Sequence, residues 1–100
     1  MDSSTVKKNA GKSRRNVSLS AFPNPASAHS NINITYTLAD KNYDNYLVIR
    51  NILGAEVVAV LLNPYENNTS IDASVLKSGV YFYTIENNKQ IVVAKKLVVQ

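Results

Sequence analysis

The sequence predicts an all-β fold, an immunoglobulin-like antiparallel β-sandwich of about seven strands. Apolar and polar residues alternate with a period of two along most of the chain from Asn16 onward. Turn residues interrupt this alternation roughly every 8–12 residues, and no segment shows the helical period of about 3.6 residues. The chain has 100 residues, the size of one domain, and it has neither Cys nor Trp. The disulfide and Trp of antibody domains are therefore missing, and only the architecture is predicted.

The first three predicted strands occupy the N-terminal half of the sandwich. In Val17–Ala21, apolar residues alternate with Ser, which predicts a strand. This strand ends before Pro23, because a residue without an N–H stops ladder pairing. In Ile32–Leu38, large apolar residues alternate with Asn and Thr, which predicts a half-buried strand. A turn over Asp40–Asn45 then leads into a third strand over Leu47–Asn51.

Four more strands are expected after this point. Gly54 precedes the apolar run Val57–Leu62, and a Gly there can take the positive φ of a short hairpin loop. A loop rich in Asn separates this strand from a short one at Thr69–Asp72. The last two predicted strands are Val80–Ile85 and Ile91–Val99.

The positive charge of the chain is concentrated at its N-terminus. The net charge is +4, and residues 1–15 contain five basic residues and one acidic residue, so five minus one accounts for all of it. Residues 16–100 contain six basic and six acidic residues and are neutral. We interpret residues 1–15 as a disordered basic linker or leader, with a phosphate-binding arm as the alternative, and residues 16–100 as the folded domain. A nucleic-acid-binding fold would need a basic face of its own.

The residues that usually carry catalysis or bind metals are sparse. One His and no Cys cannot form a zinc site of the usual kind, and no G-x-S-x-G segment is present. The acidic segment Asp40–Asp44 lacks the Gly and the downstream Glu of a calcium loop. We therefore expect no catalytic residue, no metal and no cofactor. A non-catalytic adhesion or binding module of an extracellular protein remains a general alternative.

Five short segments together resemble a known family. Each is a weak signal alone, but they occur in the family's order and at its spacing over residues 19–100. The segments are Phe22–Ala26, Ile34–Leu38, Leu47–Val57, Ile71–Phe82 and Lys95–Val99. They are similar to the type IX secretion system C-terminal sorting domain, that is, the type A sorting domain of the Por secretion system. One departure is Arg50, where the family commonly has an aromatic residue, and we expect this position to face solvent.

The resemblance implies a function in protein transport. It implies a C-terminal signal that targets a larger N-terminal cargo protein through the type IX system and across the outer membrane. The implied partners are the outer-membrane translocon and a sortase-like protease, which commonly cuts in the linker before the domain. The implied location is the periplasm in transit and then the cell surface or the extracellular space. Neither nucleic acid nor a small-molecule substrate is implied.

The same resemblance singles out a set of motif residues. They are Pro23, Asn24, Pro25, Gly54, Leu76, Gly79, Tyr81, Lys95, Lys96, Leu97, Val98 and Val99. The two prolines prevent edge pairing, and the spacing that ends at Tyr81 is similar to a tyrosine corner, in which the hydroxyl bonds the preceding connection. Adjacent strand residues face opposite sides, so we expect at least one of the two lysines to be exposed. For each motif residue, a role in folding and a contact with the secretion machinery both remain open.

Overall fold

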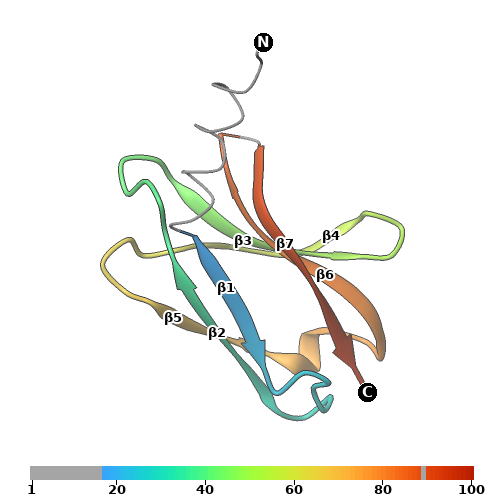
Figure 1. Ribbon diagram of the computed structural model, residues 1–100. Coiled ribbons are helices and arrows are strands. Elements are labelled where there is room, and N and C mark those ends of the chain that lie inside the picture. The colour runs from blue at the N-terminus through green and yellow to red at the C-terminus, as the bar shows by residue number, and fades with distance from the viewer. Residues whose placement is uncertain (1–16, 89) are drawn as a thin grey trace.

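The computed structural model describes residues 17–88 and 90–100 as two antiparallel β-sheets packed face to face (Figure 1). The first sheet has the order β1 (Ser18–Phe22), β2 (Asn31–Thr37), β5 (Asn68–Asp72). The second has the order β4 (Glu56–Leu61), β3 (Asn45–Asn51), β6 (Gly79–Asn87), β7 (Gln90–Val99). The predicted all-β sandwich is confirmed, and each expected strand is present. The prediction for residues 1–15 falls outside the described residues.

The strand order differs in one respect from an antibody constant domain. There the fourth strand belongs to the sheet of the first, second and fifth strands. Here β4 pairs with β3 at the outer edge of the other sheet. One short 3-10 helix, η1 (Ala73–Val75), connects β5 to β6. None of the described residues form a helix long and apolar enough to cross a bilayer.

Alternating side chains from both sheets fill one core. The largest fully buried side chains are Leu19, Ile32, Ile34, Leu47, Ile49, Ile85 and Leu97. Each buried aliphatic side chain of this size contributes about 1.5 to 3 kcal/mol by leaving water. These residues come from five of the seven strands, so the core holds both sheets together.

Three tyrosines, Tyr36, Tyr81 and Tyr83, are buried in the core. A buried hydroxyl needs a hydrogen-bond partner, and the backbone supplies it for Tyr36, which donates to the Asn63 carbonyl at 2.9 Å. The Tyr83 hydroxyl lies beside the backbone of Ala21 in β1. Burial raises the pKa of Tyr36 and of Tyr83 above the ordinary value of 10.0.

The third tyrosine, Tyr81, forms the expected corner. Its hydroxyl donates to the Lys77 carbonyl at 2.7 Å, across the connection between η1 and β6. Asp72, the last residue of β5, caps the start of η1, and its Oδ1 accepts the Ser74 N–H at 2.9 Å. Leu76 is buried below the connection, and Gly79 has φ +155°, which a residue with a Cβ rarely adopts.

Tyr81→Phe keeps the buried ring and removes only the hydroxyl. We expect it to lower the free energy of unfolding by about 1 kcal/mol, because the Lys77 carbonyl loses its donor. The matched control is Tyr65→Phe, at an exposed hydroxyl that makes no hydrogen bond with the described residues. Urea denaturation of the two variants tests this. Equal midpoints would show that the Tyr81 hydroxyl contributes nothing to stability.

Candidate functional site

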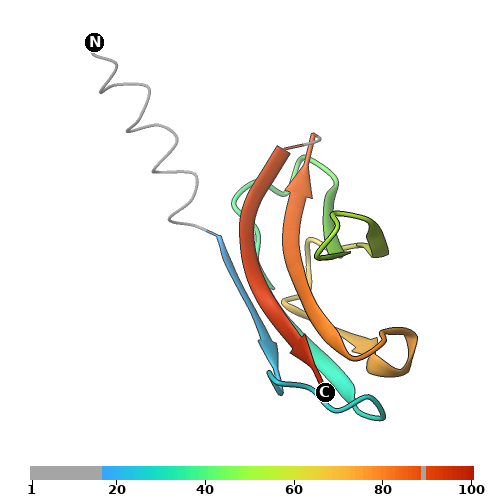
Figure 2. The ribbon, with the colours of Figure 1, turned by 90° about the vertical axis from the view of Figure 1, so that its right-hand side faces the viewer.

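The first of the five motif segments, Phe22–Ala26, is called the opening motif. It lies along the edge of β7 that does not pair with β6. One side of β7 pairs with β6, and the segment after β1 covers part of the other side (Figure 2). The Asn24 Nδ2 donates to the Lys96 carbonyl at 2.9 Å, and the Asn24 Oδ1 accepts the Val98 N–H at 3.0 Å. One side-chain amide thus supplies the donor and the acceptor that a neighbouring strand would supply.

Ala26 continues this contact with its backbone. Its N–H donates to the Val98 carbonyl at 2.8 Å, and its carbonyl accepts the Gln100 N–H at 2.8 Å. Ala26 is fully buried, so a larger side chain would have no space here. We call these contacts of Asn24 and Ala26 with Lys96, Val98 and Gln100 the terminal clamp.

Two prolines flank Asn24 in the clamp. The pairing of β1 with β2 ends at Phe22, immediately before Pro23, as the sequence predicts. Neither Pro23 nor Pro25 has an N–H, so neither can extend a ladder of its own. The contact with β7 therefore depends on the side chain of Asn24 and the backbone of Ala26.

Most of the predicted motif residues meet at this place in the fold. Gly79 and Tyr81 of β6 pair with Val99 and Leu97 of β7, so the tyrosine corner and the clamp adjoin the same strand. Gly54 is the exception, because it lies in the turn between β3 and β4 and β6 separates β3 from β7. The sequence motifs thus form one cluster around β7 and one separate hairpin.

The two lysines of β7 are both exposed. Lys95 lies opposite Tyr83 and shares a face with the buried Leu97, but β7 is an edge strand and its inner face is only partly covered there. Lys96 lies on the outer face opposite Phe82. The expectation of at least one exposed lysine is confirmed. Exposed charge on an edge strand also opposes pairing with other chains.

An apolar surface lies beside Lys96. Phe82 is 45% exposed and Val80 is 36% exposed, and both belong to the outer face of β6. We call Val80, Phe82 and Lys96 the outer β6–β7 surface. Neither Val80 nor Phe82 is among the motif residues named from the sequence. The alternation of β6 does place them opposite the buried Tyr81, but both faces of this strand are apolar and the pattern does not say which one is covered.

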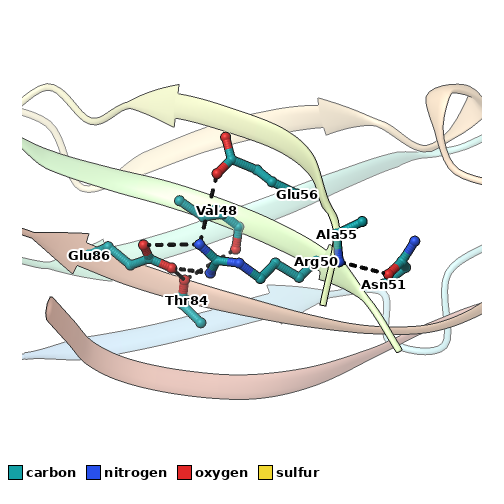
Figure 3. Close-up of polar contacts among 7 residues, drawn as sticks. All are labelled: Val48, Arg50, Asn51, Ala55, Glu56, Thr84 and Glu86. Carbon is teal, nitrogen blue, oxygen red and sulfur yellow. Dashed lines mark hydrogen bonds and ion pairs between the residues drawn. The ribbon is translucent and has the colours of Figure 1, made fainter. Parts of the chain in front are cut away.

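Arg50 lies on the outer face of the same sheet, in the centre of an ion-pair network (Figure 3). Both of its Nη atoms contact the Glu86 carboxylate, with Nη2 at 3.3 Å from Oε1, and Nη2 is 3.8 Å from Oε2 of Glu56. Thr84 donates to Glu86 at 2.7 Å. Arg50 therefore joins β3 to β4 and β6. The expectation that it simply faces solvent is incomplete, because its two carboxylate partners cover part of it.

The hairpin after Arg50 is fixed by one side chain and one glycine. The Asn51 Oδ1 accepts the N–H groups of Leu53 and Ala55, both at 3.0 Å. Gly54 has φ +87°, the left-handed conformation expected from the sequence. The turn leaves the side chains of Ile52 and Leu53 largely exposed. The motif around Gly54 is thus a rigid turn with an apolar tip.

The described residues do not gather the side chains of a metal centre. His29 is exposed, and across residues 17–88 and 90–100 no three His, Asp or Glu side chains are placed to hold a metal ion. The features that distinguish the molecule are therefore the terminal clamp and the exposed surfaces beside it. Such features define a small β-sandwich whose last strand is held from both sides.

Comparison with known protein families gives this class a name. The family model described as the secretion system C-terminal sorting domain matches residues 20–100, which include both halves of the clamp. The chain belongs to this family, whose members are C-terminal sorting signals of the type IX secretion system. Such a signal directs secretion to the cell surface or the extracellular space, and the family is in general non-catalytic. No curated protein matches the chain.

The Arg50 network predicts a dependence of stability on pH. The hydrogen bond from Arg50 lowers the pKa of the Glu86 carboxyl below its ordinary value of 4.5. A lowered folded-state pKa means that the ionised carboxylate stabilises the fold above about pH 4.5, and that this contribution is lost as the pH falls through the folded-state pKa. Glu86→Gln should therefore be less stable than wild type at neutral pH, and the difference should shrink on acidification.

Denaturation midpoints measured from about pH 7 down to about pH 3 test this expectation. Asp44→Asn is the matched control, because it removes an exposed carboxylate that makes no ion pair with the described residues. The control should follow the wild-type curve. A difference in denaturation midpoint between wild type and Glu86→Gln that stays constant over the whole pH range would contradict the expectation.

Proposed function

We propose that this chain is an export label that carries a larger N-terminal cargo protein through the periplasm and across the outer membrane. We propose further that the outer-membrane machinery recognises the outer β6–β7 surface. One observation supports this proposal above all. Two of the motif segments, Ile71–Phe82 and Lys95–Val99, include the neighbouring strands β6 and β7, and their exposed residues Val80, Phe82 and Lys96 lie side by side on one face.

Residues of these two segments separate into two groups by burial. Leu76, Tyr81, Leu97 and Val99 are buried, and folding alone accounts for their identity. Val80, Phe82 and Lys96 are exposed, and the core gives no reason for an aromatic or an aliphatic residue at the first two positions. A partner that covers this surface would give such a reason.

The chemistry of the surface suits a protein partner. Recognition sites on proteins commonly combine an aromatic anchor with a polar rim. Phe82 lies between Arg50 and Lys96 in the register of the sheet. Arg50 is neutralised by two carboxylates, whereas no described acidic side chain forms an ion pair with Lys96. The lysine therefore keeps its charge available for an acidic group of the machinery.

Processing at the cell surface completes the proposal. A sortase-like protease of the type IX system would cut before the domain and release the cargo or join it to surface lipopolysaccharide. The described fold suits such a cut, because β1 begins at Ser18 and cleavage before Val17 leaves every described strand intact. The sandwich would remain folded during recognition and would be discarded afterwards.

A fusion of residues 16–100 to the C-terminus of a periplasmic reporter tests the label in a host with this secretion system. The wild-type fusion should reach the medium or the cell surface. Phe82→Ser and Lys96→Ala should each reduce export, since loss of about 1.4 kcal/mol of contact energy weakens recognition about tenfold. The matched controls are Ile91→Ser, at another exposed apolar residue of β7, and Lys41→Ala, at an exposed lysine of a loop.

The outcomes of this experiment separate the two parts of the proposal. Retention of the intact fusion in the periplasm would reject the label and favour a binding or adhesion module. Normal export of both surface variants would keep the label but reject the outer β6–β7 surface. Surface substitutions usually change stability little, so each variant should have the wild-type midpoint of urea denaturation. This measurement excludes unfolding as the cause of lost export.

A further inference from the structure

The outer edge of β4 has no partner strand among residues 17–88 and 90–100. The Leu62 N–H donates to the Asn45 carbonyl at 2.8 Å at one end of the β3–β4 ladder. Hydrogen-bonded and non-bonded pairs alternate in an antiparallel ladder. The backbone N–H and carbonyl of Val60 therefore point toward β3, as those of Leu62 do, and the backbone groups of Ala59 and Leu61 point away from β3. Within the described part of the chain, no strand pairs with this side of β4.

The open edge lacks the protection that β7 has. β7 carries two exposed lysines, and the terminal clamp covers part of its edge. The run Val57–Leu62 contains no charged residue and no Pro. Natural edge strands usually carry one of these features, because an unprotected edge pairs with other chains.

The side chains of β4 are also incompletely covered. Leu61 is 56% exposed on the outer face of the sheet. Val58 and Val60 point toward the core but remain half-buried, because β4 projects beyond the facing sheet (Figure 1). An added strand would cover apolar surface on both faces of β4 as well as its backbone.

We propose that the edge of β4 pairs with β4 of a second copy of this chain, antiparallel about a two-fold axis at Val60. A register shift between Ile49 and Arg50 marks an irregularity of β4 near Val57, so the regular part is Val58–Leu61 of β4, continued by Leu62. Centring this part on Val60 places each Ala59 opposite Leu61 of the second copy. Both residues of that pair direct their backbone groups outward, so each pair exchanges two hydrogen bonds.

The second copy fits this edge chemically. The small Ala59 faces the large Leu61, and the two Val60 side chains meet on the inner face. No like charges oppose each other, because Glu56 lies outside the paired segment and contacts its own Arg50. The six acidic and six basic residues of the segment 16–100 cancel, so two sandwiches do not repel each other through net charge. Pairing would join the two four-stranded sheets into one continuous sheet.

Single-cysteine variants of the full chain test the register, since the protein has no Cys of its own. Val60→Cys should form a disulfide-linked dimer under mild oxidation, because directly opposed non-bonded residues have Cα atoms about 4.5 Å apart. A mixture of Ala59→Cys and Leu61→Cys should also form a disulfide-linked dimer, because these two positions lie directly opposite each other. Either variant alone should link more slowly, because its two cysteines would be diagonal neighbours across the interface. Ile91→Cys is the control at an exposed apolar residue of β7.

Analytical ultracentrifugation of the purified wild-type chain measures the association without a cross-link. Pairing through one edge buries less area than a standard interface of about 1,600 Å², so we expect a dimer that forms in the micromolar to millimolar range, with a Kd of roughly 1 μM or above. Ala59→Lys should weaken association at least about tenfold, and Ile91→Lys should leave it unchanged. These measurements need no secretion system, so their outcome is independent of the export proposal.

Three results would overturn the proposal. If the wild-type protein stays monomeric at about 1 mM, the edge of β4 does not pair with a second copy, and the partner would be a strand of another protein. Cross-linking of Ile91→Cys as fast as Val60→Cys would show non-specific encounters. Cross-linking of Ala59→Cys alone as fast as the mixture would contradict the proposed register.

Discussion

The arrangement of the molecule depends on the hydrogen bonds between the Asn24 side chain and the backbone of β7. A strand at the edge of a sheet has unpaired N–H and carbonyl groups, and these must be satisfied by water or by another part of the chain. Here one amide group supplies both partners, at 2.9 Å and 3.0 Å, and the backbone of Ala26 continues the contact. The first motif of the chain thereby fixes its last strand.

This constraint gives the exposed residues of β7 a defined position. With β6 on one side and the clamp on the other, Lys96 is held beside Phe82 on the outer face. The backbone of Ala26, in the segment after β1, bonds Val98 and Gln100 and so joins the first sheet to β7. A domain without disulfides thus presents a fixed pattern of charge and apolar surface, which is what a portable label requires. Among the described residues, none gives β4, at the opposite edge of the sheet, such cover.

The sequence predicts the strands well because their period of two is regular and because Gly and Pro mark the turns. It also predicts the Tyr81 corner, since the spacing to the preceding connection is local. The partner of Asn24 could not be predicted, because it lies 72 residues away and an exposed Asn between prolines resembles an ordinary turn. Arg50 shows the same limit, since its carboxylate partners come from two other strands.

Hydrogen exchange at the Val98 amide tests the terminal clamp most directly. In wild type this amide should be protected to nearly the level of Leu97, because Asn24 accepts its hydrogen bond. Asn24→Ala should speed Val98 exchange about tenfold or more, while Asn33→Ala, at an exposed Asn of β2, should leave it unchanged. Unchanged protection of Val98 in Asn24→Ala would contradict the account, because the last strand would then be held without the opening motif.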